Sequence, residues 1–148
     1  MPKTLWKESS RNELLGRIER LKPDAAPLWG KFTAPQMLSH LNGWMLMATG
    51  ELQTRNRKLL LRFAPVKQLA IYVLPFPKGL PTAPELLTQN PVDWSAEHAR
   101  ICRHIDNFES THRNKPFPPH PAFGLLTPGA WGVLGYRHTD HHLRQFGV

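Results

Sequence analysis

Cysteine is almost absent from the chain. Its 148 residues include one cysteine, Cys102, so neither an internal disulfide nor a thiolate zinc cluster can form. Long apolar runs are missing too: residues 1–10 lack the core of a signal peptide, and Arg62, Pro65 and Lys67 interrupt the most apolar stretch, 59–76. We therefore expect a cytoplasmic protein with no disulfide, no membrane-spanning segment and no membrane partner.

Acidic residues are scarce relative to basic ones. Asp and Glu number 11 against 19 Lys and Arg, which gives a formal net charge of +8 and a pI of about 10.2. Such an excess attracts nucleic acid, acidic membrane surfaces or anionic metabolites. The one dense basic run lacks the interleaved exposed aromatic residues on which single-stranded nucleic acid stacks; it comprises Arg55, Arg57, Lys58, Arg62 and Lys67. The sequence therefore favours a basic surface over a nucleic-acid-binding module.

Period-two alternation bounded by hairpin turns is also missing, so a sheet is not expected. Apolar residues recur instead at three- and four-residue steps, as on one face of an α-helix. With 41% hydrophobic and 20% charged residues, the composition is that of an ordinary globular protein, and we expect residues 1–148 to form a single domain. The expected class is all-α, a bundle of four long helices with an extra helical segment.

Capping signals and prolines set the expected ends of these helices. Thr33 and Gln36 have the spacing of a capping box, and Thr127 caps a helix with proline in its first turn. Pro65 should kink or divide the extra segment, because proline removes a helical hydrogen bond. The expected ranges are 9 or 10 to 21 with Ser9 or Ser10 as the cap, 33–49, 56–74, 93 or 95 to 112, and 127–146.

Proline is abundant, and nine of the fifteen prolines fall in two segments, 75–91 and 116–121. Proline restricts the backbone even before folding, so both segments should be stiff loops. We expect these loops to cover one end of the bundle. On that reading Phe76, Phe117 or Phe123 should lie near the entrance of a pocket.

Three histidines fall on helix faces that should be buried. His138 and His142 are four residues apart, which places both imidazoles on one face of the last helix, one turn apart. His40 shares an apolar face of the second long helix with Met37 and Trp44. Neutral imidazole is the commonest metal ligand, and three of them with a water molecule form an open, catalytic type of site.

Two alternatives remain open at this point. Each histidine could be an ordinary core residue with its own hydrogen-bond partner. If a metal is bound, His141 lies close enough in angle to compete with His142, and His120 could reach the site from the second proline-rich loop. Among the other candidates, Cys102 should be an inert thiol and Asp140 should point away from His138. Glu85 is the only acidic residue that could swing toward the site.

Residues 138–145 resemble the final-helix signature of the DinB-like (DinB/YfiT) metalloprotein superfamily. That signature is a histidine, three residues, a second histidine, and a glutamine three residues later. A histidine on the second helix of that superfamily corresponds to His40. The chain is also similar to a subfamily catalogued only as a domain of unknown function, through residues 29–37, 75–79, 81–85, 120–124 and 144–148. The resemblance implies a DinB-like four-helix bundle with His40, His138 and His142, and not His141, as ligands.

The same resemblance implies zinc or nickel as the divalent metal and a homodimer as the frequent state. The function it suggests is a metal-dependent enzyme, a thiol-linked transferase or a hydrolase, acting on a small molecule such as a low-molecular-weight thiol. Whether the protein is an enzyme at all stays open. The first alternative is a non-enzymatic metal- or ligand-binding bundle. The second, which the sequence favours less, is a basic nucleic-acid-binding module.

Overall fold

The structure is a computed structural model that describes residues 1–57, 59–79, 82, 84–86 and 92–148. This part of the chain is all-helical, as the sequence predicts, and contains no β-strand, only one isolated bridge between His120 and Gly124. The helices are α1 (Glu8–Arg20), α2 (Ala34–Thr49), α3 (Val66–Tyr72), α4 (Trp94–Asp106), α5 (Phe108–His112) and α6 (Pro128–Gln145), with 3₁₀ turns η1 (Leu60–Arg62) and η2 (Pro84–Leu86).

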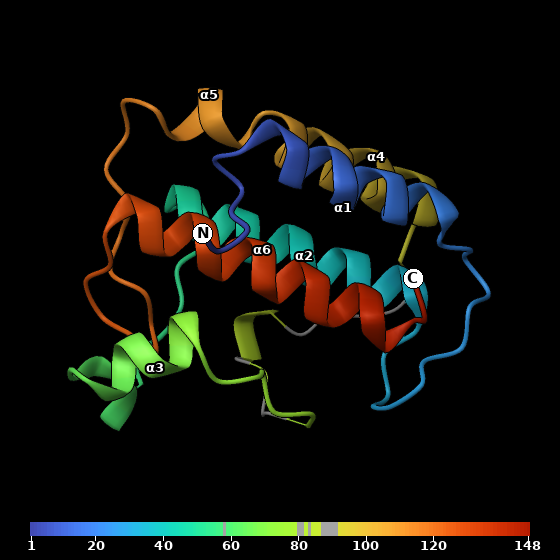
Figure 1. The fold of residues 1–148 in the computed structure, drawn as a ribbon. Helices are drawn as coiled ribbons and strands as arrows, with labels where there is room; N and C mark the ends of the chain where they lie inside the picture. The colour runs from blue at the N-terminus through green and yellow to red at the C-terminus, as the bar shows by residue number, and fades with distance from the viewer. Residues whose placement is uncertain (58, 80–81, 83, 87–91) are drawn as a thin grey trace.

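The four longest helices, α1, α2, α4 and α6, pack around a common core. Helix α1 packs against α4 and α6, and α2 packs against the same two helices (Figure 1). Helix α3 and η1 lie together on the outside of α6, below it in Figure 1 and far from α1 and α4. None of the helices in the described residues is both long and apolar enough to cross a membrane.

Two of the predicted helix starts are confirmed. The side chain of Thr33 accepts the backbone N–H of Gln36, and the Gln36 side chain accepts the backbone N–H of Thr33, which completes the capping box of α2. Thr127 likewise accepts the backbone N–H of Ala130 at the start of α6. These reciprocal bonds satisfy donors that a helix start otherwise leaves unpaired.

The expected start of α1 is wrong. Lys7, whose side chain makes no capping bond, precedes the helix, and Ser9 and Ser10 lie inside it. A contact just before the helix explains the difference. Leu5 is fully buried, and its backbone N–H donates to the carbonyl of Gly132 on α6 at 3.0 Å. This tertiary anchor fixes where the chain enters the helix, and it outweighs the local capping preference of serine.

The expected helix over 56–74 is only partly present. Pro65 does divide the segment, with η1 before it and α3 after it, but residues 56 and 57 are not helical. Arg57 donates its backbone N–H to the carbonyl of Pro121 at 2.8 Å, so this stretch pairs with the second proline-rich loop. The continuous helix expected up to residue 112 is likewise interrupted, because α4 ends at Asp106 and α5 begins at Phe108.

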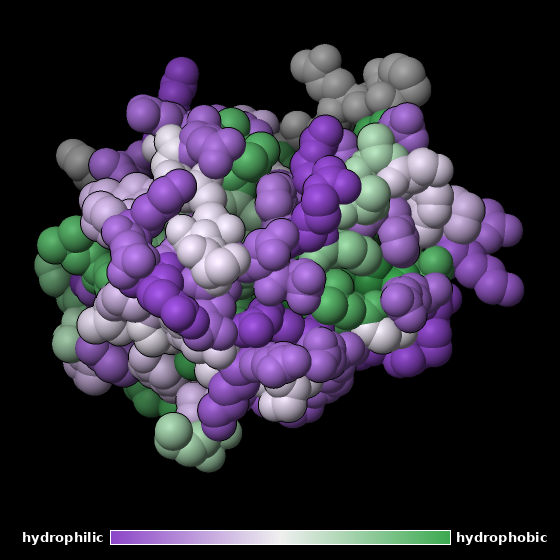
Figure 2. Space-filling view, turned by 90° about the horizontal axis from the view of Figure 1, so that it is seen from above, coloured by the Kyte–Doolittle hydropathy of each residue, from purple (hydrophilic) through white to green (hydrophobic). Residues whose placement is uncertain are grey.

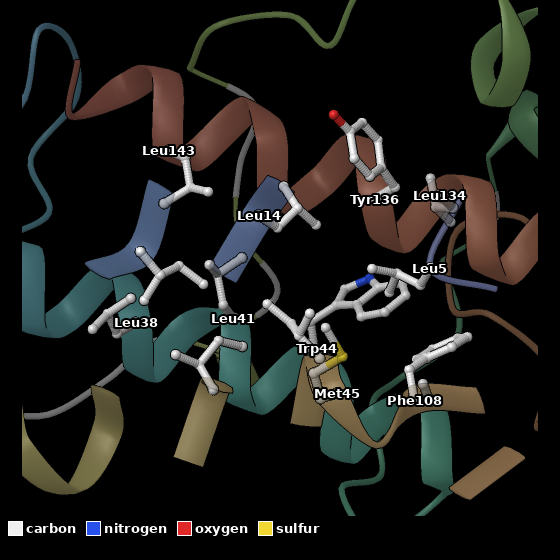
Figure 3. Close-up of a cluster of buried hydrophobic side chains, with 14 of the residues drawn as sticks. Leu5, Leu14, Leu38, Leu41, Trp44, Met45, Phe108, Leu134, Tyr136 and Leu143 are labelled. Atoms are coloured by element: carbon white, nitrogen blue, oxygen red, sulfur yellow. The ribbon is translucent and has the colours of Figure 1, made fainter. Parts of the chain in front are cut away.

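Apolar side chains from α1, α2, α4 and α6 fill the centre. Leu14 and Ile18 of α1, Leu41 of α2, Ile101 of α4 and Leu143 of α6 are all at most 1% exposed. Figure 3 shows side chains from α2 and α6 pointing toward each other across this core. Each fully buried aliphatic side chain contributes about 1.5–3 kcal/mol to folding, so the core gives the long helices a source of stability that does not involve the three histidines. On the side seen in Figure 2 the surface is mostly hydrophilic.

Candidate metal centre

The structure brings together the three histidines that the sequence singles out. His40 comes from α2, and His138 and His142 come from successive turns of α6. Nε2 of His40 lies 3.0 Å from Nε2 of His138, and one nitrogen of each of the three rings lies within 4.8 Å of the others. His40 and His142 are buried, while His138 keeps part of its surface exposed. Nδ1 of His138 is itself buried, so the exposed part of this residue does not include that ring nitrogen.

The proton of His40 is fixed on the ring nitrogen that faces away from the cluster. Its Nδ1 lies 3.2 Å from the backbone carbonyl of Leu86, the last residue of η2. A carbonyl oxygen only accepts, so Nδ1 carries the hydrogen and Nε2 presents a lone pair to the cluster. This is the tautomer that a metal ligand needs.

The proton of His142 is fixed by a chain of two hydrogen bonds. The amide nitrogen of Gln145 donates to the backbone carbonyl of Trp29 at 2.8 Å, so the amide oxygen must face His142. That oxygen lies 2.8 Å from Nδ1 of His142, which therefore donates to it. Nε2 of His142 is left with a lone pair directed away from Gln145.

Gly30 makes the link between Trp29 and Gln145 possible. Its φ of 78° lies in the left-handed region, and a Cβ at this position would come within 2.6 Å of the amide nitrogen of Gln145. Glycine meets both demands because it has no Cβ. The segment 29–37 therefore has two tasks: it supplies the acceptor for Gln145, and it begins the helix that carries His40.

His138 differs from the other two histidines in its support. Its Nδ1 is buried and has no hydrogen-bond partner among the described residues. Its ring contacts are aromatic instead, with centroids 5.7 Å from Trp44 and 6.5 Å from Phe76. Packing, together with the 3.0 Å contact between its Nε2 and Nε2 of His40, therefore orients this ring.

Burial lowers the pKa of all three imidazoles. Desolvation lowers the pKa of His40 to about 4, although the Leu86 carbonyl acts in the opposite direction. Desolvation and then the charge of His40 lower the pKa of His142 to about 3. Burial, followed by the two neighbouring imidazoles, places the pKa of His138 well below its ordinary value of 6.5. All three rings are therefore neutral at pH 7, as metal ligands must be.

Besides Trp44, two aromatic rings pack against the cluster. The Phe32 ring centroid lies 5.3 Å from that of His40, and Phe76 lies 5.8 Å from His141 next to the cluster. Phe76, which was expected near a pocket entrance, lies beside the cluster, with its ring centroid 6.5 Å from that of His138. Phe117 and Phe123 lie elsewhere, Phe117 stacked on Trp131 and Phe123 against His120. Phe32 was missed, although it directly precedes a capping box, where an apolar residue often packs onto the helix.

His141 and His120 both lie outside the cluster. His141 is half-buried, with its ring against Trp29 and Phe76. Nδ1 of His120 accepts the backbone N–H groups of Ala122 and Phe123 at 3.1 and 3.3 Å, which closes a tight turn in the second proline-rich loop. Its Nδ1 lone pair is thus already used within the loop.

The two acidic candidates are engaged elsewhere. Asp140 points away from the cluster, as expected, and forms an ion pair with Arg17 of α1 at 2.6 Å. Glu85 accepts the backbone N–H of Arg55 at 3.1 Å. In the described part of the chain, no carboxylate makes a hydrogen bond with His40, His138 or His142.

The donor set fits a divalent metal of borderline softness. Zinc–nitrogen distances are about 2.0–2.1 Å, which puts two nitrogens of a tetrahedral ion about 3.3 Å apart. The 3.0 Å between the Nε2 atoms of His40 and His138 is close to that value. Three neutral imidazoles suit zinc or nickel better than magnesium or calcium, which prefer oxygen ligands.

The fold and the site together define a protein that is all-helical in its described part, with three histidines that could hold a metal ion. A family model described as "Protein of unknown function (DUF1569)" matches residues 7–147, so the chain belongs to this family. Comparison with the curated proteins yields no match, and comparison with the solved structures yields none either.

Proposed function

We propose that the chain is a DinB-like four-helix bundle that binds one zinc or nickel ion through His40, His138 and His142. The observation that carries this proposal is the convergence of three neutral imidazoles on one point. Two of them are held in the coordinating tautomer by buried acceptors, the Leu86 carbonyl and the Gln145 side chain. Metal-ligating histidines typically have such a partner on the ring nitrogen that does not bind the metal. A core histidine can have one too, so the support counts here because the other ring nitrogens also lie together.

We further propose that the protein is an enzyme of the cytoplasm that transfers a group to or from a small thiol. An ion held by three neutral ligands would supply a positive charge that favours the thiolate form of a substrate. No carboxylate in the described part makes a hydrogen bond with the three imidazoles, so the site lacks the acidic general base that many metal-dependent hydrolases use. A thiol loses its proton more easily than water and depends less on a general base, because its pKa is about 8.5 and that of water is about 15.7.

The chain's own residues would hold and orient the reactants. Leu86 and Gln145 keep the protons of His40 and His142 on Nδ1, away from the reacting sulfur. Phe32 and Phe76 exclude water from two sides of the cluster. The thiolate sulfur would form a bond to an electrophilic carbon, the leaving group would depart with its electron pair, and the thiol proton would go to solvent.

The number of ligands favours this function over a purely structural metal site. A structural zinc site has four protein ligands, whereas the group in the described residues contains three. His120 and His141, the two candidates for a fourth ligand, face other partners.

The test is thiol consumption by metal-loaded protein. Wild-type protein loaded with zinc or nickel is incubated with a low-molecular-weight thiol and a panel of electrophiles, and loss of free thiol is followed. We expect consumption above the uncatalysed rate, its loss in His138→Ala and its retention in His120→Ala. Absence of consumption across the panel by protein with one bound ion per chain would refute the transferase proposal and leave a metal-binding protein.

A further inference from the structure

Residues 52–84 form the most basic part of the chain. This stretch contains six basic residues and no acidic one, so it carries +6 of the net charge of +8; the six are Arg55, Arg57, Lys58, Arg62, Lys67 and Lys78. In the described residues, neither Arg62 nor Lys67 forms an ion pair with a carboxylate. Their charges are therefore available to an anionic partner.

The same stretch exposes an apolar stripe on η1 and α3. Leu60 is 80% exposed, Phe63 66% and Val73 67%, and Val66 and Leu69 are also exposed between them. Val66 and Leu69 are three residues apart on α3 and so lie on one side of the helix, and Val73 follows directly after its last residue. We call these five residues the α3 face. A contiguous exposed apolar surface of this kind marks an interaction site.

The α3 face is held outward by contacts on the other side of the helix. Ile71 is buried, and the guanidinium of Arg137 on α6 donates to the carbonyls of Ala70, Ile71 and Leu74 at the end of α3. These bonds satisfy carbonyls that a helix end leaves unpaired. Figure 1 shows α3 and the preceding turn projecting from the molecule on the side away from α1 and α4.

A groove runs beside the α3 face. It has a volume of about 660 Å³ and lies between η1 and residues 123–125. Leu60, Phe63 and Leu125 line it, and Arg62 and Lys67 flank it; Lys67 donates to the carbonyl of Leu125 at 3.0 Å. Apolar side chains with a basic rim are the composition of segments that lie in the interface of an anionic membrane.

We propose that the α3 face docks on an anionic lipid surface, with its apolar side chains among the acyl chains and Arg62 and Lys67 at the phosphates. A second copy of this chain would bring the basic rims of two α3 faces together, because a twofold contact places the same patch on both sides. Nucleic acid would leave the aliphatic side chains against phosphate. The sequence argument against a membrane partner concerned spanning segments, and docking at the surface needs none.

The proposal is tested by sedimentation of the full chain with vesicles. One set consists of phosphatidylcholine, and the other of three parts phosphatidylcholine to one part phosphatidylglycerol. Each basic side chain near such a surface contributes about fivefold to the partition coefficient. We expect the double variant Arg62→Gln/Lys67→Gln to bind anionic vesicles about 25-fold more weakly. Lys22→Gln/Lys115→Gln, with the same net charge, should bind nearly as wild type.

The apolar contribution is tested with Leu60→Gln/Phe63→Gln, for which we expect at least a tenfold loss of binding. Leu28→Gln, at a position 71% exposed on another side, should change little. Melting curves of all variants verify that each is folded. Equal losses in the target and control variants would overturn the proposal, since they would show adsorption by net charge alone. Unchanged vesicle binding in Leu60→Gln/Phe63→Gln would also overturn it, and a loss of dimer in that variant would identify the α3 face as a contact between copies.

Discussion

Replacing Gln145 by leucine removes the acceptor that holds the proton of His142 on Nδ1. The two hydrogen bonds of Gln145, to His142 and to the Trp29 carbonyl, are both 2.8 Å long, and Gln145 is only 4% exposed. In Gln145→Leu the His142 proton can move to Nε2, the nitrogen that must coordinate. Loss of such a partner lowers metal affinity about 10–100-fold, which corresponds to about 1.4–2.7 kcal/mol.

Isothermal titration of metal-free Gln145→Leu with zinc measures this effect. The matched control is Gln68→Leu, the same substitution at an exposed position of α3. Gln145→Glu separates the two bonds, because its carboxylate still accepts from His142 but cannot donate to Trp29. Its zinc affinity should fall less than that of Gln145→Leu. A zinc affinity of folded Gln145→Leu within about threefold of wild type would refute the role assigned to Gln145.

Further predictions concern the supports of the site. Gly30→Ala should lower the melting temperature by about 5 °C and weaken zinc binding, because alanine is strained at this φ and its Cβ would meet Gln145; unchanged melting and titration curves would contradict this. Since burial lowers the pKa of His40 to about 4 and of His142 to about 3, the unfolded metal-free protein binds more protons than the folded one between about pH 6.5 and 4. The free energy of unfolding of the metal-free protein should therefore fall as the pH drops through this window. The difference in melting temperature between metal-loaded and metal-free protein should persist to about pH 5 and disappear below about pH 4. A difference that disappears near pH 6.5 would contradict these pKa values. Arg137→Gln should speed hydrogen exchange in residues 66–74 by about 30-fold, the equivalent of about 2 kcal/mol, and unchanged exchange would show that its bonds do not hold α3.

The sequence predicted a helix end correctly where residues close in the sequence determine it. The capping box of Thr33 and Gln36 set the start of α2, because both partners of each hydrogen bond lie within three residues. The start of α1 was misplaced because it depends on Leu5 and the carbonyl of Gly132, which are 127 residues apart in the sequence. Residues 56 and 57 were wrongly assigned to a helix for the same reason, since Arg57 bonds to Pro121 in the second proline-rich loop.

Helix periodicity predicted which faces of the helices carry the three histidines of the candidate site. The four-residue spacing of His138 and His142 placed both on one face of α6, and the apolar neighbours of His40 placed it inward. The choice of His142 over His141 came from a family resemblance, and the structure places His142 in the cluster. The hydrogen bond from His40 to the Leu86 carbonyl could not be predicted from the sequence, because any residue can supply a backbone acceptor.

Binding of one metal ion by His40, His138 and His142 can be measured by elemental analysis of purified protein that is expressed with zinc and nickel in the medium. We expect about one ion per wild-type chain and a content well below one in His142→Ala, with the helical circular dichroism retained. His141→Ala and His120→Ala should keep the full content. Full occupancy in His142→Ala with loss in His141→Ala, or no bound metal in the wild-type protein, would show that these three histidines are not the metal site.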